Sequence, residues 1–589
     1  MAKKPLQKLE LTWIGKGDEP KLEPRILVEN PEYSYGDPNT ENMLIHGDNL
    51  LALKALEQDY AGKVKCIYID PPYNTGNAFE HYDDNLEHSI WLNLIYQRIK
   101  LLHRLLANDG AFCMHLDDQE VHYAKILCDE IFGRTNFIVT VAIKSSTPSG
   151  VKTAHRDKKI IKQKDLMIVY KKSDNLKINP QYIKKDSWDS HYSLFLEENN
   201  GTFELKSLIN ILLEKGIITE RLSVRDLDIN NSRFKKFYIE HKDQICRLQS
   251  HKNEPAREYS LNNMNKVIEY ESKDGKRKDF YYNGQVVTPL SQSIQEVVWN
   301  REVSQDLGML LCDFWYDIDF QNTQNEGGVD FPNSKKPESM IYRILSMFSD
   351  ENDIILDSFL GSGTTAAVAH KMGRRYIGIE LGDHAITHCY PRLKAVVDGE
   401  QGGISKSVNW KGGGGFKFYT LAPSLLKKDK FDNWIISKEY NADMLAAAMA
   451  KQEGFRYNPH ESIYWKQGQS SESDFIYTTT QFLTVESLDQ IKDEMQPDET
   501  LLICCKSYQK ECKNKYPGIL IKKIPQMLLG RCEFGKDDYS LNIINSPLQE
   551  SDHSEEQSET STDSISVQEL LLKKKKLNKK PNDYPGLFD

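Results

Sequence analysis

Residues 64–73 of the chain carry the sequence VKCIYIDPPY, in which a short apolar run ends at an Asp-Pro-Pro-Tyr motif. Such a run is typical of a strand that is buried on both faces of a parallel sheet. The motif residues Asp70, Pro71, Pro72 and Tyr73 would then follow the carboxyl end of that strand, where open α/β sheets bind their ligands. The four residues rarely occur together by chance, so we expect a functional site rather than an ordinary turn.

The chain continues past the motif with an alternation of helix and strand. Ser89 would begin a helix whose apolar residues Ile95, Ile99, Leu102 and Leu106 share one stripe. A glycine at position 110 would end that helix before a strand at residues 111–116. This alternation predicts a parallel sheet with helices on both faces.

The alternation returns only after a long interruption. Residues 353–356 and 376–379 are expected strands, and a helix between them runs through His370. From about residue 141 to residue 330 the chain is basic, polar and irregular, apart from a hairpin predicted at Asn283-Gly284. We therefore expect one sheet that is encoded in two pieces, with a domain inserted between them.

A second motif, DSFLGSGTT, occupies residues 357–365. Gly361, Gly363 and Ala366 match the spacing Gly-x-Gly-x-x-Gly/Ala, which permits a tight turn and a close approach of the backbone to a nucleoside cofactor. Glu380 ends the next strand, where a carboxylate can accept hydrogen bonds from ribose hydroxyls. Together these signals predict a cofactor that contains adenosine. No Lys follows the glycines, so the loop is not a P-loop that hydrolyses nucleotides.

The other candidates for cofactor contacts lie in or beside these loops. Asp48 follows the strand expected before the one at residues 64–69, and it is a candidate to bind the adenine of the cofactor. A role in a turn or as a helix cap is an equal alternative. The set predicted to bind the cofactor is Asp48, Asp357, Phe359, Gly361, Gly363, Thr364, Thr365 and Glu380.

The Asp-Pro-Pro-Tyr motif suits transfer to the amino group of a nucleobase, whose lone pair is delocalised into the ring. The Asp70 carboxylate and the Pro71 carbonyl can accept both N–H bonds and localise that lone pair. The prolines fix φ and keep the two acceptors in register. A base must leave the duplex to reach such a pocket. Tyr73 offers a ring for stacking, and Phe79 is a second candidate wall that could equally be a core residue.

The distribution of charge favours a nucleic-acid substrate more than the formal net charge of -10 does. Residues 141–190 hold twelve Lys and Arg against five Asp. We expect contacts to DNA phosphates from Lys144, Lys152, Arg156, Lys158 and Lys159.

Composition sets further limits. No stretch approaches the roughly 20 apolar residues that span a bilayer, and the first eight residues contain no apolar signal segment, so no membrane partner and a cytoplasmic location are expected. The ten cysteines form no Cys-x-x-Cys pair. They are predicted to be reduced core thiols, and no metal is expected.

The combined motifs resemble the amino-methyltransferases of DNA in the β arrangement, in which the catalytic motif precedes the recognition domain and the cofactor motif comes last. The resemblance rests on residues 70–76, on Phe359-x-Gly361-x-Gly363, and on the stretch Phe331-Pro332-Asn333 with Lys335-Lys336-Pro337. It implies a Rossmann-like α/β sheet in permuted order, S-adenosyl-L-methionine as cofactor, and methylation of the 6-amino group of adenine at a particular DNA sequence. Asp as the first motif residue favours adenine over the 4-amino group of cytosine.

A narrower resemblance is to the modification (Mod) subunits of type III restriction-modification systems. It is carried by the extended motif Asp-Pro-Pro-Tyr-Asn-Thr-Gly, by residues 129–133 and by residues 412–419. It implies a homodimer that binds double-stranded DNA and partners a helicase-nuclease restriction subunit. The alternatives are an orphan methyltransferase for adenine or for the 4-amino group of cytosine, a catalytically silent DNA-specificity module, and an enzyme that methylates RNA or protein Gln.

The predicted organisation has six parts. They are an N-terminal arm (1–41), the first part of the methyltransferase domain with the catalytic motif (42–140), an inserted α+β target-recognition domain (141–330), the second part with the cofactor motif (331–399), a C-terminal α/β domain (400–547), and a tail that is first acidic and then basic (548–589). The tail is expected to be disordered because it contains too few apolar residues.

Overall fold

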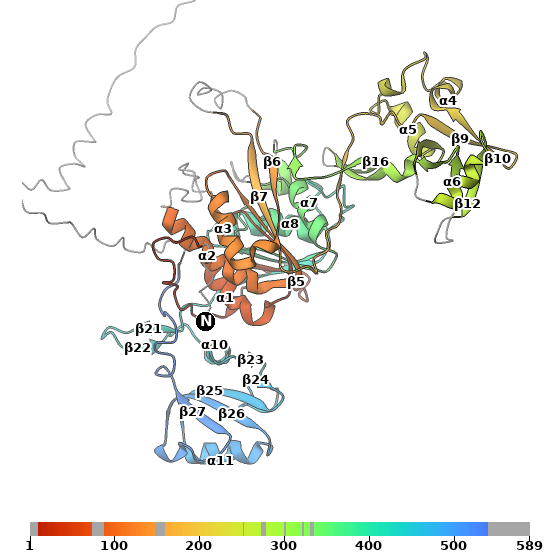
Figure 1. The fold of residues 1–589 in the computed structure, drawn as a ribbon. Coiled ribbons are helices and arrows are strands. Elements are labelled where there is room, and N and C mark those ends of the chain that lie inside the picture. Colours follow the sequence, from red (N-terminus) through yellow and green to blue (C-terminus); the bar gives the residue numbers. More distant parts are fainter. Residues whose placement is uncertain are drawn as a thin grey trace, which may run out of the picture. The chain divides into compact units, whose positions relative to one another are not determined.

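The computed structural model describes residues 10–72, 88–147, 160–250, 253–271, 278–299, 302–320, 323–329 and 335–539 (Figure 1). The described residues all belong to one large compact unit, and the predicted tail (548–589) lies outside the described residues.

An 11-stranded mixed sheet forms the centre of the large unit. Its strands run in the spatial order β1-β20-β3-β19-β18-β4-β5-β7-β6-β17, and β2 pairs with β20. Strands β20, β3, β19, β18, β4 and β5 are parallel, whereas β7 is antiparallel to both of its neighbours. The bounds are β1 Leu27–Glu29, β2 Tyr35–Gly36, β3 Met43–His46, β4 Val64–Ile69, β5 Leu106–Leu116, β6 Phe137–Lys144, β7 Lys164–Lys171, β17 Phe314–Trp315, β18 Ile354–Asp357, β19 Arg375–Glu380 and β20 Gly415–Leu421.

The two halves of the chain meet inside this sheet at β4 and β18. Leu356 of β18 lies opposite Ile67 of β4, and Ile355 lies opposite Cys66. All four side chains are fully buried, as expected for strands with helices on both faces. The prediction that one sheet is encoded in two pieces is therefore confirmed.

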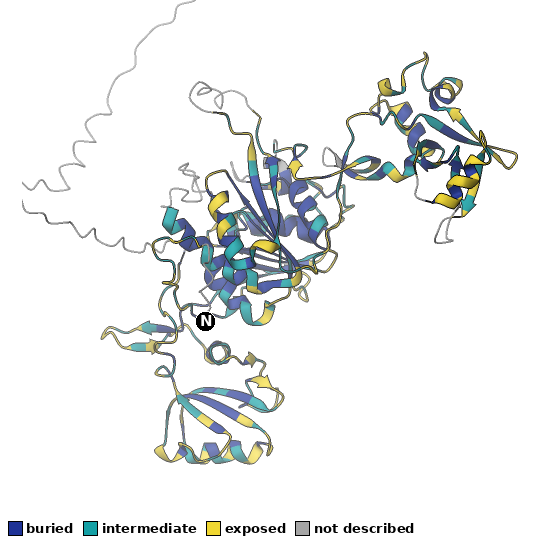
Figure 2. Ribbon diagram, viewed as in Figure 1, coloured by how far each residue is buried: buried dark blue, intermediate teal, exposed yellow. Residues whose placement is uncertain are grey.

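Helices cover both faces of the sheet (Figure 1), and the residues of the sheet are mostly buried between them (Figure 2). One buried cluster joins one face to α1 Asn49–Tyr60, α2 His88–Leu105 and α3 Val121–Phe132. The other joins the opposite face to α7 Glu338–Phe348, α8 Thr364–Lys371 and α9 Tyr390–Val397. Side chains alternate along a strand, so Ile67 points to the first layer and Tyr68 to the second.

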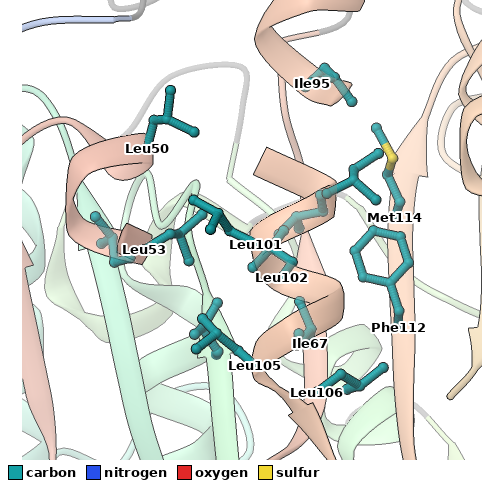
Figure 3. Close-up of a cluster of buried hydrophobic side chains, with 14 of the residues drawn as sticks. Leu50, Leu53, Ile67, Ile95, Leu101, Leu102, Leu105, Leu106, Phe112 and Met114 are labelled. Atoms are coloured by element: carbon teal, nitrogen blue, oxygen red, sulfur yellow. The ribbon is translucent and has the colours of Figure 1, made fainter. Parts of the chain in front are cut away.

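Helix α2 shows how the first layer packs (Figure 3). Ile95 and Leu102 are fully buried in the same cluster as Phe112 and Met114. The expectation that the helix includes Leu106 is wrong, since α2 ends at Leu105 and β5 begins at the next residue. The physical reason is strand pairing. Leu106 already pairs with Val64, and the register shifts before the regular part of the ladder, so residue 110 lies inside the strand instead of ending the helix.

The inserted region contains a second, six-stranded sheet of order β10-β9-β11-β14-β13-β12. Its strands are β9 Leu194–Asn199, β10 Thr202–Ser207, β11 Ile245–Gln249, β12 Val267–Glu271, β13 Lys278–Tyr282 and β14 Gln285–Pro289, and its helices are α4 Leu208–Glu214, α5 Ser232–Glu240 and α6 Glu254–Leu261. The predicted hairpin is confirmed, because Tyr282 pairs with Gln285 across Asn283 and Gly284, whose φ values are 47° and 81°. Three further strands, β8 Tyr182–Lys184, β15 Ile294–Trp299 and β16 Glu302–Leu310, pair with one another.

Residues 415–539 add a hairpin and a third sheet. The hairpin is β21 Leu426–Lys428 with β22 Trp434–Ile436. The sheet has the order β23-β24-β25-β26-β27, with bounds Arg456–Tyr457, Gly468–Ser471, Asp474–Leu483, Thr500–Tyr508 and Ile519–Lys523. Helix α10 Ala442–Glu453 packs into one buried cluster with this sheet and α11 Val485–Glu494 into another. Short 3₁₀ turns occur at Arg134–Asn136, Val224–Asp226, Leu290–Ser293, Thr323–Gly328 and Lys510–Cys512.

Across the described part of the chain, no helix combines the length and the apolar character needed to pass through a bilayer.

The packing of α2 gives a test of stability. Ile95→Ala should lower the free energy of unfolding by about 2–5 kcal/mol, because it removes a fully buried side chain from a filled core. Ile126→Ala on α3 is the matched control, since that side chain is 39% exposed and its truncation should cost less than about 1 kcal/mol. Urea unfolding of the full-length proteins measures both. Equal losses would contradict the core described here.

Candidate active site

Three acidic side chains lie at the carboxyl ends of neighbouring strands. Asp70 follows β4, Asp357 ends β18 and Glu380 ends β19. Burial raises the pKa of Asp357 to about 7. Hydrogen bonds from Thr365 and the Phe359 amide oppose this rise in pKa, and the negative charges of Asp70 and Glu380 add to it. The candidate catalytic carboxylate and the cofactor motif therefore lie within electrostatic reach of each other at one edge of the sheet.

The glycine turn after β18 is tied to the strand beside it. The Gly361 amide donates to Oε2 of Glu380 over 2.7 Å, and the Gly382 amide donates to Oε1 over 3.3 Å. Gly363 has a φ of 81° and precedes α8, and a Cβ atom there would lie 3.3 Å from the Cα atom of Cys389. Position 363 therefore favours glycine through its positive φ, and a side chain there would also crowd Cys389.

Side chains of the motif also fix the shape of the turn. Oδ1 of Asp357 accepts from the Phe359 amide over 2.9 Å, and Oδ2 accepts from the Thr365 hydroxyl over 2.6 Å. The Thr364 hydroxyl accepts from Nη1 of Arg392 over 2.7 Å. The loop is thus shaped by its own predicted residues, in addition to any contact that they make to a cofactor.

Asp48 caps the first helix. Its Oδ1 accepts from the Leu51 amide over 3.0 Å, and its Oδ2 lies 3.4 Å from Nη2 of Arg98 and accepts from the Tyr539 amide over 3.0 Å. The helix-cap alternative therefore describes the contacts of this side chain, and its role in binding the cofactor stays a prediction. The neighbouring Asn49 donates to the Ser358 carbonyl over 2.7 Å, which joins the start of α1 to the glycine turn.

A buried charge cluster behind the turn was missed by the sequence analysis. Glu338, at the start of α7, lies 2.8 Å from Nη2 of Arg392 and 2.8 Å from Nζ of Lys371, and all three side chains are fully buried. Burial raises the pKa of Glu338, but the charges of Arg392 and Lys371 more than offset burial and hold this pKa below its ordinary value. No periodicity signals such a cluster, because its members come from three separate helices.

The Asp-Pro-Pro segment is held by two contacts from distant parts of the chain. Nζ of Lys336 lies 2.7 Å from Oδ2 of Asp70, and both side chains are mostly buried. The Pro72 carbonyl accepts from Nε1 of Trp91 over 2.7 Å, and Pro71 is buried. Lys336 belongs to the Lys-Lys-Pro stretch on which part of the family resemblance rests. That resemblance was the one signal in the sequence that could have pointed to the contact between Lys336 and Asp70.

Several predicted site residues lie outside the described residues. They are Tyr73 and Phe79 of the base pocket, Phe331, Pro332 and Asn333 of the stretch before the cofactor motif, and Lys152, Arg156, Lys158 and Lys159 of the DNA-binding set. Lys144 is described and is exposed at the end of β6. Since β6 runs parallel to β5, Lys144 lies at the same edge of the sheet as Asp70.

The residues of the turn fit a nucleoside cofactor. The Ser358 hydroxyl is buried and makes no hydrogen bond to any described residue. It lies in the loop whose positive-φ glycines allow the backbone to approach a ligand closely. A buried polar atom of this kind normally has a partner, which a bound ligand would supply.

The described residues contain no group of three or more His, Cys, Asp or Glu arranged to hold a metal ion. All ten cysteines are free thiols, and eight of them are buried. The prediction that they are core thiols is wrong for Cys312, which is exposed beside the short edge strand β17, and Cys532 is only partly buried.

A family model described as DNA methylase matches residues 64–390, which is more than half of the 589 residues. This chain belongs to the DNA methylase family. The match confirms the predicted resemblance to DNA amino-methyltransferases, and it begins at β4 and ends in α9, so it covers both motifs of this DNA methylase.

Curated relatives of this DNA methylase include Mod subunits. A protein of Haemophilus influenzae named as a probable type III restriction-modification enzyme HindVI Mod subunit is 37% identical in an alignment of 433 positions that covers 67% of this chain and 56% of the relative. The type III restriction-modification enzyme EcoP15I Mod subunit of Escherichia coli is 25% identical in an alignment of 491 positions that covers 71% of this chain and 72% of the relative. The chain thus spans little more than half the length of the first relative.

Among solved structures, the M1.HpyAVI–SAM complex matches this DNA methylase with 13% sequence identity and a TM-score of 0.28. The match covers 60% of this chain and 98% of the chain in that structure. This similarity is too low to add to the fold described above.

The unusual environment of Asp357 gives a prediction about pH. Its pKa rises from an ordinary value of 3.8 to about 7 in the fold. Between these values the unfolded chain has released the proton and the folded protein keeps it, so rising pH favours unfolding. The free energy of unfolding of the wild type, minus that of Asp357→Asn, should therefore fall as pH rises from about 5 to 7. Urea unfolding at several pH values checks this, and a difference that rises with pH would contradict it.

Proposed function

We propose that this chain transfers a methyl group from S-adenosyl-L-methionine to the 6-amino group of adenine at a particular DNA sequence. The observation that carries the proposal is the pairing of β4 with β18. It brings Asp70 and Pro71 to the same edge of the sheet as the glycine turn at residues 361–363. A single site at that edge would have hydrogen-bond acceptors for an amino group on one side. On the other side it would have the glycine turn, which could bind the nucleoside of a cofactor.

In the proposed reaction, Asp70 and the Pro71 carbonyl accept the two N–H bonds of the flipped adenine. This interaction favours a pyramidal nitrogen whose lone pair points at the methyl donor. The nitrogen forms a bond to the methyl carbon as the bond from that carbon to sulfur breaks, and one amino proton leaves to solvent or transiently to Asp70. The hydrogen bond from Trp91 to the Pro72 carbonyl would hold the loop in place during this step.

The cofactor, when bound, supplies a methyl group activated by a sulfonium centre. We propose that the turn at Gly361 and Gly363 admits its nucleoside, and that the free Ser358 hydroxyl offers it a hydrogen bond. Glu380 would contact the ribose while it orders the turn through the Gly361 amide. Asp357, Thr364 and Thr365 would act by shaping the loop around it.

DNA would approach along the edge of the sheet that Asp70 and Lys144 share. A surface hollow of about 310 Å³ lies at this edge and is lined by Lys144, by the hydroxyl-bearing residues 145–147 and by Tyr316 and Phe320. Its lining also includes Ile318, Asp319 and Asp317, and the carboxylate of Asp317 pairs with Arg343. A lysine with hydroxyl groups suits a phosphate, and aromatic rings suit an unstacked base. The inserted sheet of β9–β14 is the proposed target-recognition domain, while β6 and β7 belong to the methyltransferase sheet.

The order of the motifs supports the permuted arrangement of the β class. The catalytic motif follows β4, and the cofactor motif follows the later strand β18 beside it. We propose that residues 42–140 and 331–399 form the methyltransferase domain together with β6, β7, β17 and β20, which lie in the same sheet. The predicted C-terminal domain (400–547) would then be separate only after β20.

We further propose that the chain is the modification subunit of a type III system. The support is the similarity to two Mod subunits, of which one aligns over 72% of its own length. A homodimer and a helicase-nuclease restriction subunit as partner belong to the same proposal. Single-molecule sequencing of native DNA, with and without the gene, tests the modified base and the recognised sequence together. Methylated cytosine in place of adenine would overturn the choice of base.

The catalytic proposal predicts that Asp70→Ala slows methyl transfer by at least about 100-fold, because it removes an acceptor made for the reacting amino group. Binding of S-adenosyl-L-methionine should stay within a few-fold of wild type. The measurement is transfer of tritiated methyl groups to long unmethylated duplex DNA, with cofactor affinity measured separately by calorimetry.

The matched control is Asp118→Ala. Its carboxylate forms a 2.7 Å ion pair with Lys164 near the same edge and is 47% exposed, so its loss should leave the rate nearly unchanged. An Asp70→Ala protein that methylates DNA at the rate of the wild type would contradict the assignment.

A further inference from the structure

A row of polar side chains lies on one face of the large sheet beside Asp70. Side chains alternate along a strand, so Asp70 shares its face of β4 with Cys66 and Tyr68, which pack into the buried cluster that contains α7. Lys336 lies two residues before the start of that helix in the chain and 2.7 Å from Asp70. The ion pair therefore joins the catalytic loop to the segment that leads into α7.

The same face carries a second carboxylate. Asp165 lies in β7, two residues from Met167, which belongs to the same cluster. Its Oδ2 lies 3.7 Å from Nε2 of His115, and its Oδ1 lies 3.3 Å from Nζ of Lys162. His115 is fully buried on β5, and its Nδ1 lies 3.1 Å from the hydroxyl of Tyr68. Asp165 is thus connected back to the strand that leads into Asp70.

Lys336 forms its 2.7 Å ion pair with Asp70, and its positive charge also acts on Asp165 without a direct ion pair between them. Strands β4 and β7 flank β5, so their backbones are about 10 Å apart at the usual spacing of strands. Burial raises the pKa of Asp165, but its contact with His115 and the positive charges of Lys336 and Lys162 hold this pKa well below its ordinary value. The charge of Lys336 therefore acts on Asp165 as well as on Asp70.

We propose that Lys336 is a positioning residue for Asp70, and that Asp165, supported by His115, holds Lys336 from the other side. A carboxylate paired with an ammonium group keeps lone pairs for further hydrogen bonds, and it loses freedom to rotate. Lys336 would fix the Asp70 oxygens in the orientation that the incoming amino group needs. This inference rests on the proposed function, because it assigns Asp70 the role of acceptor.

The test compares variants of the full chain in single-turnover methyl transfer to long unmethylated duplex DNA. Lys336→Met should slow the rate by about 100-fold, as expected for a misplaced catalytic group, while the affinities for S-adenosyl-L-methionine and DNA change little. Lys336→Arg keeps the charge and should restore most of the rate. Asp165→Asn should slow the reaction by roughly 10-fold, since Lys336 keeps its contact with Asp70.

The double variant Lys336→Met with Asp165→Asn decides whether Asp165 acts through Lys336. If it does, Asp165→Asn has no further effect once Lys336 is gone. Asp118→Asn is the matched control, because it removes one charge from an exposed pair on the neighbouring segment.

Three results would overturn the proposal. They are a Lys336→Met enzyme with the rate of the wild type, a loss of rate that Lys336→Arg fails to restore, and effects of Lys336→Met and Asp165→Asn that multiply fully in the double variant. An active Asp70→Ala enzyme would instead overturn the proposed function. An inactive Asp70→Ala enzyme together with a fully active Lys336→Met enzyme would overturn the positioning role alone.

Discussion

The parallel pairing of β4 with β18 is the contact on which the site depends. These strands lie almost 300 residues apart in the chain, yet Leu356 and Ile67 face each other in the ladder. Because parallel neighbours end at the same edge, the Asp-Pro-Pro segment and the glycine turn must meet there. The apolar residues of both strands are fully buried between two helical layers, which makes a shift of register costly.

The glycine turn is held more firmly than a surface loop would be. Glu380 binds the Gly361 amide from the next strand, and Asp357 binds the amide and hydroxyl groups that follow it. Behind them, Arg392 connects Thr364 to the buried carboxylate of Glu338. Buried charges are expensive unless they are paired and hydrogen-bonded, and here each member has several partners. Such a network favours one conformation of the turn, as a preorganised site requires.

The electrostatic surroundings of Asp70 are mixed in sign. The negative charges of Asp70 and Glu380 both act on Asp357, and Lys336 provides an opposing positive charge 2.7 Å from Asp70. The lysine thus places a positive charge against the negative charges that gather at this edge of the sheet. The balance of charge at the sheet edge therefore bears directly on the chemistry proposed for it.

The sequence by itself determined the buried strand before Asp70, the glycine turn, the hairpin at Asn283-Gly284 and the division of one sheet into two pieces, because each depends on local periodicity or on residues with special backbone geometry. It misplaced the start of β5, where pairing with Val64 outweighed the helical pattern. Only the tertiary structure decided that Lys336 meets Asp70, that Asp165 meets His115 and that Asp48 caps a helix while pairing with Arg98. These contacts join segments that are distant in the chain, and their distances follow from how strands and helices pack, which no local pattern of residues specifies.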